Sequence, residues 1–334
     1  MLPIEQRLQH IRDLARLGVV TYDFESILER HYRRWVLPGA TVIDIGAHAG
    51  RHLIPLLECI GPNGTAIGFE PIPSVFENLR EKLKGSGAIL VNAALSDAPA
   101  GTADFVFAQG APEESGLRQR IYQVPETVLT ATTIQVRVES LDNFARDLSR
   151  LDYVKIDIEG GEIGCLTGAR ETIARFRPVI SVEYGSPAYS VYGHTKQTLF
   201  DLARSYGYVL YDIFLNCLET LEDWLAACDT TCWDYLMVPV ERKGEFDTRM
   251  LQPAPRLEAL IEQNLAMEQK AATELRAKVA ELQARTAFLE ERDARAAELE
   301  KHNAALLRSR SWRITAPLRA ISRIAKRRGS PRGP

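Results

Sequence analysis

Short runs rich in β-branched and aromatic residues alternate with segments of helical periodicity between residues 40 and 240. This alternation predicts βαβ units and therefore a parallel sheet. Because the runs are apolar on both faces, we expect helices above and below the sheet. The predicted strands are TVIDI (41–45), TAIGFE (65–70), AILVNAAL (88–95), DYVKIDI (152–158), VISVEY (179–184), YVLYDI (208–213) and, as a last strand, DYLMVPV (234–240).

Helical segments lie between these strands. Ser74 is predicted to cap the second of them, and Gly207 is predicted to end the last. Residues 1–40 are predicted to form an N-terminal helical segment, called the preface below. Its Leu and Ile are expected to pack on the core, so we interpret the preface as structural scaffold. The predicted covering helices are HLIPLLECI (52–60), SVFENLREKLK (74–84), EIGCLTGARETIARF (162–176) and KQTLFDLARSYGY (196–208), while DFVF (104–107) and TIQVRVESL (133–141) add strand material.

A second region follows a proline-containing break, LQPAPR, at residues 251–256. Apolar residues then recur at alternating steps of four and three, which predicts a coiled-coil helix over 257–307 and a homo-oligomer formed through it. Glu268 and Asp293 interrupt the seam, so a single solvated helix is the alternative. The seam residues are Leu265, Ala272, Leu275, Val279, Leu282, Thr286 and Leu289.

The charge of the chain is unevenly distributed. Residues 1–300 hold 31 basic and 44 acidic residues, whereas the segment after Glu300 holds ten basic residues and no acid. Residues 308–334 hold nine of these basic residues together with Trp312, one Leu and three Ile, which favours an anionic membrane surface as partner. A disordered tail is the alternative. Nucleic acid is a weaker candidate because no recognisable binding module accompanies the charge.

The amino-acid composition limits the class of protein and the cellular compartment in which we expect it. With 46% apolar and 25% charged residues, the chain has the profile of a globular protein of about two domains. No apolar stretch approaches the roughly 18–20 residues of a membrane-spanning helix. The five scattered cysteines indicate a reducing compartment and no complete zinc site. We therefore expect a cytoplasmic protein, with a peripheral position at the inner face of the cell membrane as the extension suggested by the tail.

Candidate chemistry begins where the first two strands end. Asp44-Ile-Gly46-Ala-His48-Ala-Gly50 follows the first strand, and glycines at such a turn let the backbone approach a ligand. Glu70 ends the second strand, about twenty residues on, where an acid can accept hydrogen bonds from ribose hydroxyls. The turn lacks the three-glycine spacing of a dinucleotide loop. A nucleoside cofactor such as S-adenosylmethionine fits this pattern.

The order of motifs over residues 40–240 resembles the FkbM family of S-adenosylmethionine-dependent methyltransferases. The resemblance implies a methyltransferase domain over 41–245. It also implies an α/β fold with a Rossmann-like seven-stranded sheet, in which the last strand inserts antiparallel and helices cover both faces. The motifs are VIDIGAHAG, GFEPIPSVFENL, VNAALSD, VESLD, LDYVKIDIEGGEIGCLTGA and RPVISVEY.

The resemblance also implies roles for individual residues. His48 replaces the Asn usual in the family's glycine turn, and Glu114 to Leu117 resemble a loop that the family places over its substrate. The implied cofactor-binding residues are Asp44, Gly46, His48 and Gly50 at the methionine and ribose side, Glu70 at the ribose, and Asn92, Ala94 and Leu95 beside the adenine. Asp157, Glu159 and Gly160 are implied to lie beside the transferable methyl group.

A base should take the proton of an alcohol acceptor, because a neutral hydroxyl is a poor nucleophile. Carboxyl ends of parallel strands meet at one edge, so acids at those ends are the natural candidates. Some candidates also have a structural alternative to catalysis. Glu162 is expected at the start of a helix, where acids are favoured, and Glu183 could be a buried hydrogen-bond partner. His194 could cap a helix or lie at the surface. The acids also raise a divalent metal as an option, but we expect none. The catalytic candidates are Asp157, Glu159, Glu183 and His194. Tyr184, Tyr189 and Tyr192 are candidates for a stacking wall.

These observations predict an O-methyltransferase that uses S-adenosylmethionine. The resemblance implies hydroxyl acceptors on sugars and polyketides, and a membrane-directed tail favours a sugar in a glycan or in a lipid-linked polysaccharide intermediate. Two alternatives belong to other classes: a non-catalytic coiled-coil scaffold with a methyltransferase-like binding domain, and a nucleic acid methyltransferase. The sequence lacks the Asn-Pro-Pro-Tyr type of motif that base methylation commonly shows, so the sugar acceptor is preferred.

Overall fold

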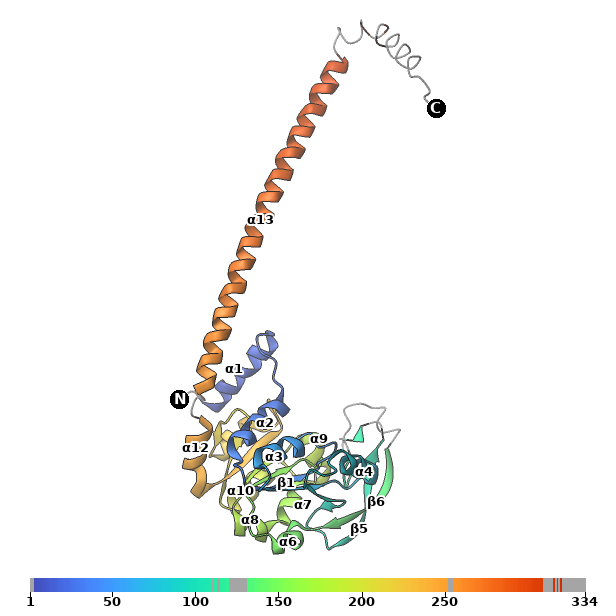
Figure 1. Ribbon diagram of the computed structural model, residues 1–334, viewed down its shortest axis with the longest axis vertical. Coiled ribbons are helices and arrows are strands. Elements are labelled where there is room, and N and C mark those ends of the chain that lie inside the picture. Colours follow the sequence, from blue (N-terminus) through green and yellow to red (C-terminus); the bar gives the residue numbers. More distant parts are fainter. Residues whose placement is uncertain are drawn as a thin grey trace. The chain divides into compact units, whose positions relative to one another are not determined.

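The computed structural model describes residues 3–109, 111–112, 115–119, 131–251 and 255–308, together with Thr315, Pro317 and Arg319. The chain divides into two compact units, Met1–Gln252 and Pro253–Pro334. Figure 1 shows the first as a layered α/β body, and in the second it shows one long helix, α13. The basic tail predicted over 308–334 lies almost entirely outside the described residues.

The main sheet of the first unit has eight strands in the order β10-β9-β11-β8-β7-β1-β2-β3. Strand β11 runs antiparallel between β8 and β9, as predicted for the last strand, and the strands from β8 to β3 are parallel. The bounds are β1 Thr41–Ile45, β2 Thr65–Phe69, β3 Ile89–Val91, β7 Tyr153–Ile156, β8 Val179–Glu183, β9 Tyr208–Asp212, β10 Cys217–Leu218 and β11 Asp234–Pro239.

The prediction of seven strands is wrong by one edge strand. β10 pairs antiparallel with β9 through Cys217 and Leu218 alone. A two-residue strand is too short to show an alternating pattern in the sequence. It nevertheless extends the sheet beyond β9, at the end away from the glycine turn.

A second, three-stranded sheet has the order β4-β6-β5, with β4 Ala94–Leu95, β5 Gly101–Ala108 and β6 Ala131–Glu139. The predicted single strand over 88–95 is therefore two strands in different sheets. The break falls at Asn92, whose side-chain amide donates hydrogen bonds to the backbone oxygens of Glu70 and Pro71, at 2.8 and 3.0 Å. Strand β4 leaves β2 at this point and pairs with β6 instead.

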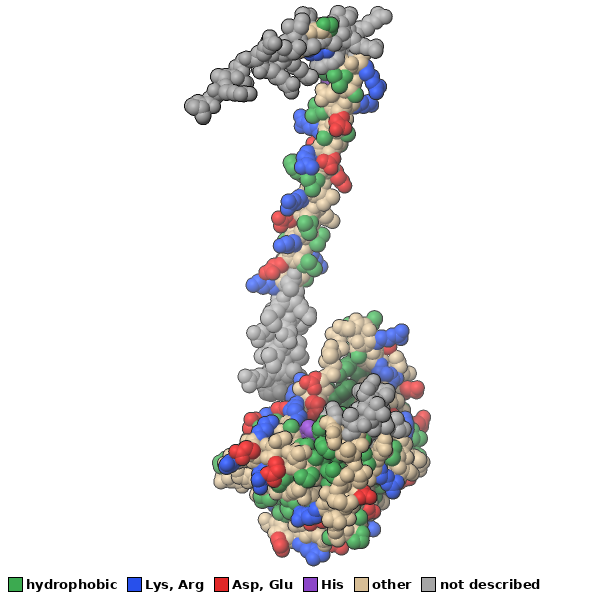
Figure 2. All heavy atoms as spheres, turned by 90° about the vertical axis from the view of Figure 1, so that its right-hand side faces the viewer, with side chains coloured by type: hydrophobic (Ala, Val, Ile, Leu, Met, Phe, Trp, Pro, Cys, Tyr) green, Lys and Arg blue, Asp and Glu red, His purple; other side chains and the backbone are tan. Residues whose placement is uncertain are grey.

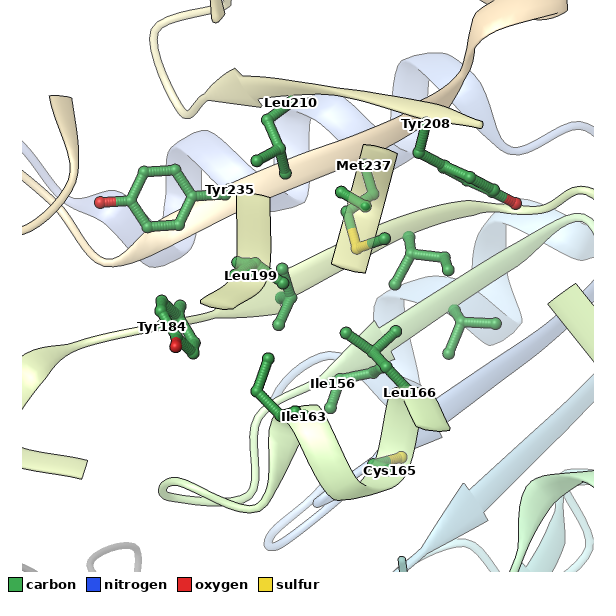
Figure 3. Packing of buried hydrophobic residues seen from close by; sticks show 14 of the residues in the cluster. Ile156, Ile163, Cys165, Leu166, Tyr184, Leu199, Tyr208, Leu210, Tyr235 and Met237 are labelled. Atoms are coloured by element: carbon green, nitrogen blue, oxygen red, sulfur yellow. The ribbon is translucent and has the colours of Figure 1, made fainter. Parts of the chain in front are cut away.

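Helices cover both faces of the main sheet, as expected from strands that are apolar on both sides. One core cluster joins the sheet to α1, α7, α8, α10 and α11, and part of it is shown in Figure 3. The other joins it to α2, α3 and α12. The bounds are α1 Ile4–Arg16, α2 Phe24–Trp35, α3 Leu53–Ile60, α4 Pro73–Lys82, α6 Leu141–Phe144, α7 Glu162–Thr167, α8 Arg170–Phe176, α9 Ser186–Tyr189, α10 Lys196–Ser205, α11 Leu221–Ala227 and α12 Lys243–Leu251. Short 3₁₀ turns lie at Ala145–Asp147, Ser190–Tyr192 and Val240–Arg242.

Two helix predictions need correction. Ser74 is not the cap of α4: the helix begins at Pro73, Ile72 is the flanking residue, and no side chain caps it. Proline suits the first helical position because its missing N–H has no intrahelical partner there. The helix predicted over 162–176 is two helices, α7 and α8, separated at Gly168 and Ala169. Gly207 follows α10 at φ +71°, as its predicted role requires.

The N-terminal preface consists of two helices that contribute to different cores. Ile4 and Leu8 of α1 are buried in the cluster on one face of the sheet, and Leu28, Tyr32 and Trp35 of α2 are buried in the other. The preface lies in the same compact unit as the sheet. Its second helix reaches the cavity described below.

The second unit is dominated by α13, Pro255–Arg308, a helix of 54 residues. Leu275, Val279, Leu282 and Leu289 of the predicted seam are exposed. Acidic and basic side chains are interspersed with hydrophobic ones along the described part of the helix in Figure 2. Among the described residues, no helix is both long and apolar enough to cross a membrane.

Candidate active site

A cavity of about 210 Å³ lies where β1, β2 and β7 end, the edge at which open parallel sheets bind ligands. The residues that follow these strands form its floor, and Phe105, Ser115 and Leu117 of the region around β5 contribute to another wall. Ser115 and Leu117 belong to the loop that the family resemblance placed over the substrate. Glu114 lies outside the described residues.

Two glycines shape the turn after β1. Gly46 has φ +87°, and a Cβ atom there would lie 1.9 Å from the backbone oxygen of Asp157. Gly50 has φ +80°, and its Cβ would meet Leu79 Cδ1 at 2.9 Å. Only glycine adopts both conformations without strain. Gly46 lines the cavity, whereas Gly50 does not. Gly50 therefore shapes the turn and does not contact the cavity.

Glu70 is 3% exposed and lines the cavity directly after β2. One carboxylate oxygen accepts a hydrogen bond from the His48 amide at 3.0 Å, and the other accepts from the Ile72 amide at 2.8 Å. Burial raises the pKa of Glu70 to about 7, although these two hydrogen bonds act to lower it. Each carboxylate oxygen can accept two hydrogen bonds. One position on each oxygen is therefore left for a pair of ligand hydroxyls.

His48 has φ +43° and lines the cavity. Its contact with Glu70 comes from the backbone N–H. The residue type that differs from the family's usual Asn therefore does not enter this interaction.

Asp44 lines the cavity with a carboxylate that has no hydrogen-bond partner among the described residues. The side chain is 1% exposed. Burial raises its pKa, while the positive charge of Lys155 acts in the opposite direction. Buried polar atoms are nearly always hydrogen-bonded in native proteins. An unpartnered acceptor facing a cavity is the feature expected where a bound donor group completes the site.

The three residues predicted beside the adenine separate into two roles. Ala94 and Leu95 line the cavity together with Ala93. Asn92 does not line it, because its amide is turned to the backbone oxygens of Glu70 and Pro71. Asn92 thus holds the loop that presents Glu70.

Asp157 follows β7 and lies in a partly buried cluster of charged residues. Its carboxylate lies 2.9 Å from Lys155 Nζ. Burial alone would raise the pKa of Asp157, but the Lys155 ammonium and a hydrogen bond with Glu183 outweigh burial and hold it at about 2. Lys155 is also the β-sheet register partner of Asp44. Asp157 is therefore ionised at neutral pH.

Glu183 is the last residue of β8 and does not line the main cavity. Its burial and the neighbouring charge of Asp157 raise its pKa well above the ordinary value. A protonated Glu183 donates a hydrogen bond to Asp157 and cannot serve as a base. The geometry favours the alternative role, a buried hydrogen-bond partner.

Glu159 and Glu162 occupy the loop after β7. Glu159 has φ +60° and lines both the main cavity and a neighbouring space of about 10 Å³, which Glu162 and Glu183 also line. Glu162 begins α7, and its Oε1 accepts a hydrogen bond from the Gly160 amide at 2.8 Å. Its Oε2 has no partner among the described residues, and burial raises the pKa of Glu162 to about 7. Only Glu159 of this pair lines the main cavity.

His194 is half-buried and lines neither of these cavities. Burial and the charge of Arg118 lower its pKa. Tyr184 and Tyr189 stack on each other with ring centroids 4.4 Å apart and are buried, so neither offers a free face for a sugar. Tyr192 lines the cavity, and its hydroxyl accepts a hydrogen bond from the Arg118 amide at 3.0 Å.

Four charged or titratable residues of the cavity went unnoticed in the sequence: Glu25, Arg51, His52 and Lys155. Lys155 had a usable signal, because a lysine inside an apolar strand and two residues before an aspartate lies on the same face as that aspartate. Glu25 had none, since its partner His52 is distant in the sequence. Among the described residues, no cluster of three or more His, Cys, Asp or Glu could hold a metal ion.

Several solved structures are similar to part of this chain. An FkbM methyltransferase from Methylobacillus flagellatus KT is 16% identical, with 70% of this chain and 58% of that protein covered and a TM-score of 0.36. Fibrillarin from Aeropyrum pernix, solved with natively bound S-adenosyl-L-methionine, is 12% identical over 61% of this chain and 67% of that one, with a TM-score of 0.34. An S-adenosylmethionine-dependent O-methyltransferase from Thermotoga maritima is 8% identical over 66% of each chain, with a TM-score of 0.37.

The chain thus spans less than two thirds of the length of the Methylobacillus protein. No curated protein sequence matches it.

The cavity lies at the strand ends of a mixed sheet that has helices on both faces. The sequence model described as the methyltransferase FkbM domain matches residues 44–210, half of the chain. The chain therefore belongs to the FkbM methyltransferase family. The cofactor of this family is S-adenosylmethionine. The residues present fit this group, because Asp44 and Glu70 both offer unused acceptors to the cavity.

Proposed function

We propose that this protein is an O-methyltransferase that transfers the methyl group of S-adenosylmethionine to a hydroxyl of a sugar in a glycan or lipid-linked polysaccharide intermediate. The observation that carries the transfer is the cavity within the family-matched region, in which Glu70 and Asp44 face an open space with unused acceptor positions. The sugar acceptor is supported by the family resemblance and by the basic tail.

The protein's own contribution is to bind and to orient. Glu70 accepts hydrogen bonds from the two ribose hydroxyls with the positions that its backbone partners leave free. When bound, S-adenosylmethionine supplies a methyl group on a positively charged sulfur. The ionised Asp157 lowers the free energy of a positive charge at this end of the cavity. Much of the rate enhancement comes from positioning the acceptor oxygen.

Glu159 is our candidate for the base. Asp157 is held too acidic by Lys155 to accept a proton readily, and Glu183 already carries one. Glu159 lines the same cavity, at the end of the same strand. Glu159 accepts the hydrogen bond from the acceptor hydroxyl and takes its proton as the oxygen attacks, while Asp157 stays ionised beside the sulfonium.

Isothermal titration with S-adenosylmethionine tests the donor site. We expect the wild-type protein to bind and Glu70→Gln to bind at least about tenfold more weakly, since the amide replaces one acceptor by a donor. Glu77→Gln, an exposed position on α4, is the matched control and should bind like wild type. A folded wild-type protein that does not bind would favour the scaffold alternative.

The acceptor is tested with S-adenosylmethionine carrying an isotopically labelled methyl group, offered to glycosides, nucleotide sugars and lipid-linked sugar extracts. A methyl ether resists mild alkali, whereas a methyl ester is hydrolysed. We expect label in an alkali-stable sugar product, with Glu159→Gln reducing its formation while donor affinity stays unchanged. Label only in nucleic acid, or only in an alkali-labile product, would overturn the assignment.

We propose two further roles for the C-terminal region: self-association through 257–307 and attachment to an anionic membrane surface through 308–334. The exposed leucines of α13 support the first, and the charge of the tail supports the second. Sedimentation with anionic liposomes should be lost when residues 308–334 are deleted. A nucleic acid methyltransferase would instead bind DNA or RNA with an affinity that falls steeply with salt.

A further inference from the structure

One wall of the cavity is built by residues that lie outside the main strand ends. Glu25 comes from α2, whereas Arg51 and His52 come from the turn that leads into α3. Glu25 also lies outside the family-matched region 44–210. The preface is therefore part of the cavity as well as part of the core.

Glu25 is held in place by a buried histidine. His52, 4% exposed, contacts the Glu25 carboxylate through Nε2 and the Tyr32 hydroxyl through Nδ1 at 3.3 Å. Burial raises the pKa of Tyr32, so its hydroxyl stays protonated and donates to Nδ1. The Nε2–H then donates to Glu25. This bond lowers the pKa of Glu25, whose side chain is about half exposed (51%), and keeps it negatively charged.

Arg51 places a positive charge on the same wall. One of its guanidinium nitrogens, Nη1, lies 2.6 Å from the Glu29 carboxylate, which also pairs with Arg33 at 2.8 Å. This contact fixes the guanidinium through one nitrogen. A guanidinium has five N–H donors, so several stay available to a ligand. Glu25 and Arg51 together present one acceptor and one donor group of opposite charge.

The covalent order of the donor determines which part of it meets this pair. S-adenosylmethionine consists of adenine, ribose, sulfur and an amino-acid end, in that sequence. With the ribose at Glu70, just after β2, the adenine lies against Ala94 and Leu95 of β4, where the family resemblance places it. The other end must then extend past β1, where Asp44, Glu25 and Arg51 line the cavity. That end is a zwitterion, with an α-ammonium and an α-carboxylate.

We propose that Glu25 and Arg51 form the subsite for the amino-acid end of the donor. Glu25 accepts a hydrogen bond from the α-ammonium, and Arg51 binds the α-carboxylate. His52 and Glu29 are positioning residues that hold these two groups. The inference deepens the proposed function and rests on it, because it assumes that the donor occupies this cavity with its ribose at Glu70.

Ligands with and without the amino-acid end distinguish binding at this subsite from binding at the rest of the cavity. S-adenosylmethionine and S-adenosylhomocysteine carry the amino-acid end, whereas 5′-methylthioadenosine has the adenosine and sulfur without it. Titration calorimetry of the full chain with each ligand gives the affinities directly. We expect Glu25→Gln and Arg51→Gln each to weaken the first two ligands by about tenfold or more and to leave 5′-methylthioadenosine unchanged.

Two controls make the result specific. Glu58→Gln, on α3 and in a surface pair with Arg33, should bind all three ligands like wild type. Glu70→Gln should weaken all three, since each contains the ribose. If Glu25→Gln and Arg51→Gln weakened 5′-methylthioadenosine equally, the pair would have a merely structural role and the inference would be wrong.

Unchanged affinity for S-adenosylmethionine in both variants would also overturn the inference, while leaving the proposed function intact. Failure of the folded wild-type chain to bind any of the three ligands would instead overturn the proposed function itself. Thermal unfolding of each variant shows whether it is folded. Glu25→Asp serves as a second variant, because it retains the charge and should recover part of the affinity that Glu25→Gln loses.

Discussion

Leu53 and Leu56 of α3 have no measurable exposure, whereas Leu275 and Leu282 of α13 are 66% and 57% exposed. The first unit encloses its apolar side chains between a sheet and two helical layers. The seam of the second unit has no such cover among the described residues. A helix gains most of its stability from packing of its apolar face. The first unit therefore buries its apolar side chains within its own contacts, whereas the exposed leucines of α13 support the self-association proposed above.

The largest expected effect tests how closely the first unit is packed. Gly46→Ala would force a methyl group to 1.9 Å from the Asp157 backbone oxygen at a residue with φ +87°. We expect a loss of ~3–5 kcal/mol in the free energy of unfolding, measured with urea. Gly39→Ala is the control, because Gly39 has φ +79° but no atom within 4 Å of its Cβ position. It should cost only about 1 kcal/mol. Equal losses would show that conformation and not packing limits position 46.

The second prediction tests whether α13 has a partner. If the seam is a coiled coil between copies, Leu282→Asp buries a charge in it and weakens association by about 3 kcal/mol per helix. Light scattering after size-exclusion chromatography gives the mass, and far-UV circular dichroism gives the helix content. Ala284→Asp introduces the same charge two residues away, off the seam, and should leave the mass unchanged. A wild-type chain that is monomeric at all concentrations would support the single solvated helix instead.

The third and smallest effect concerns pH. Burial raises the pKa of Glu162 from 4.5 to about 7 in the folded protein. Between these values the folded state holds a proton that the unfolded state has released, so stability falls as pH rises from about 4.5 to about 7. We expect Glu162→Gln to reduce the loss of stability over this interval by about 1–3 kcal/mol, as measured by urea unfolding at several pH values. A wild-type profile that rises with pH and is unaffected by the substitution would contradict this sign.

The strands were predictable where the pattern was local and continuous. TVIDI is β1 to the residue, and DYLMVPV gives β11 with its antiparallel insertion. The run over 88–95 was wrongly predicted as one strand. No local sequence feature indicates that Asn92 donates hydrogen bonds to the loop after β2, or that the chain then joins another sheet. Strand β10 was not predicted because two residues are too few to show an alternation of apolar and polar positions.

The site was predictable in its backbone and less so in its charges. Asp44 lies near the end of β1, Gly46 and Glu70 directly follow β1 and β2, and their spacing placed them at one edge. The states of Asp157 and Glu183 depend on Lys155 and on burial, which no spacing reveals. Glu25 reaches the cavity only because α2 packs beside α3, a contact between distant segments.

The position of β11 has a consequence for how the protein is made. β11 is the last strand of the sheet in sequence, yet it lies between β8 and β9. During synthesis on the ribosome, the nascent chain cannot join β9 and β10 to the parallel strands until residues 234–239 have emerged. Until then both neighbours of β11 present unpaired edges, which are prone to aggregation. Cellular yield should therefore depend on chaperone capacity late in translation of this unit.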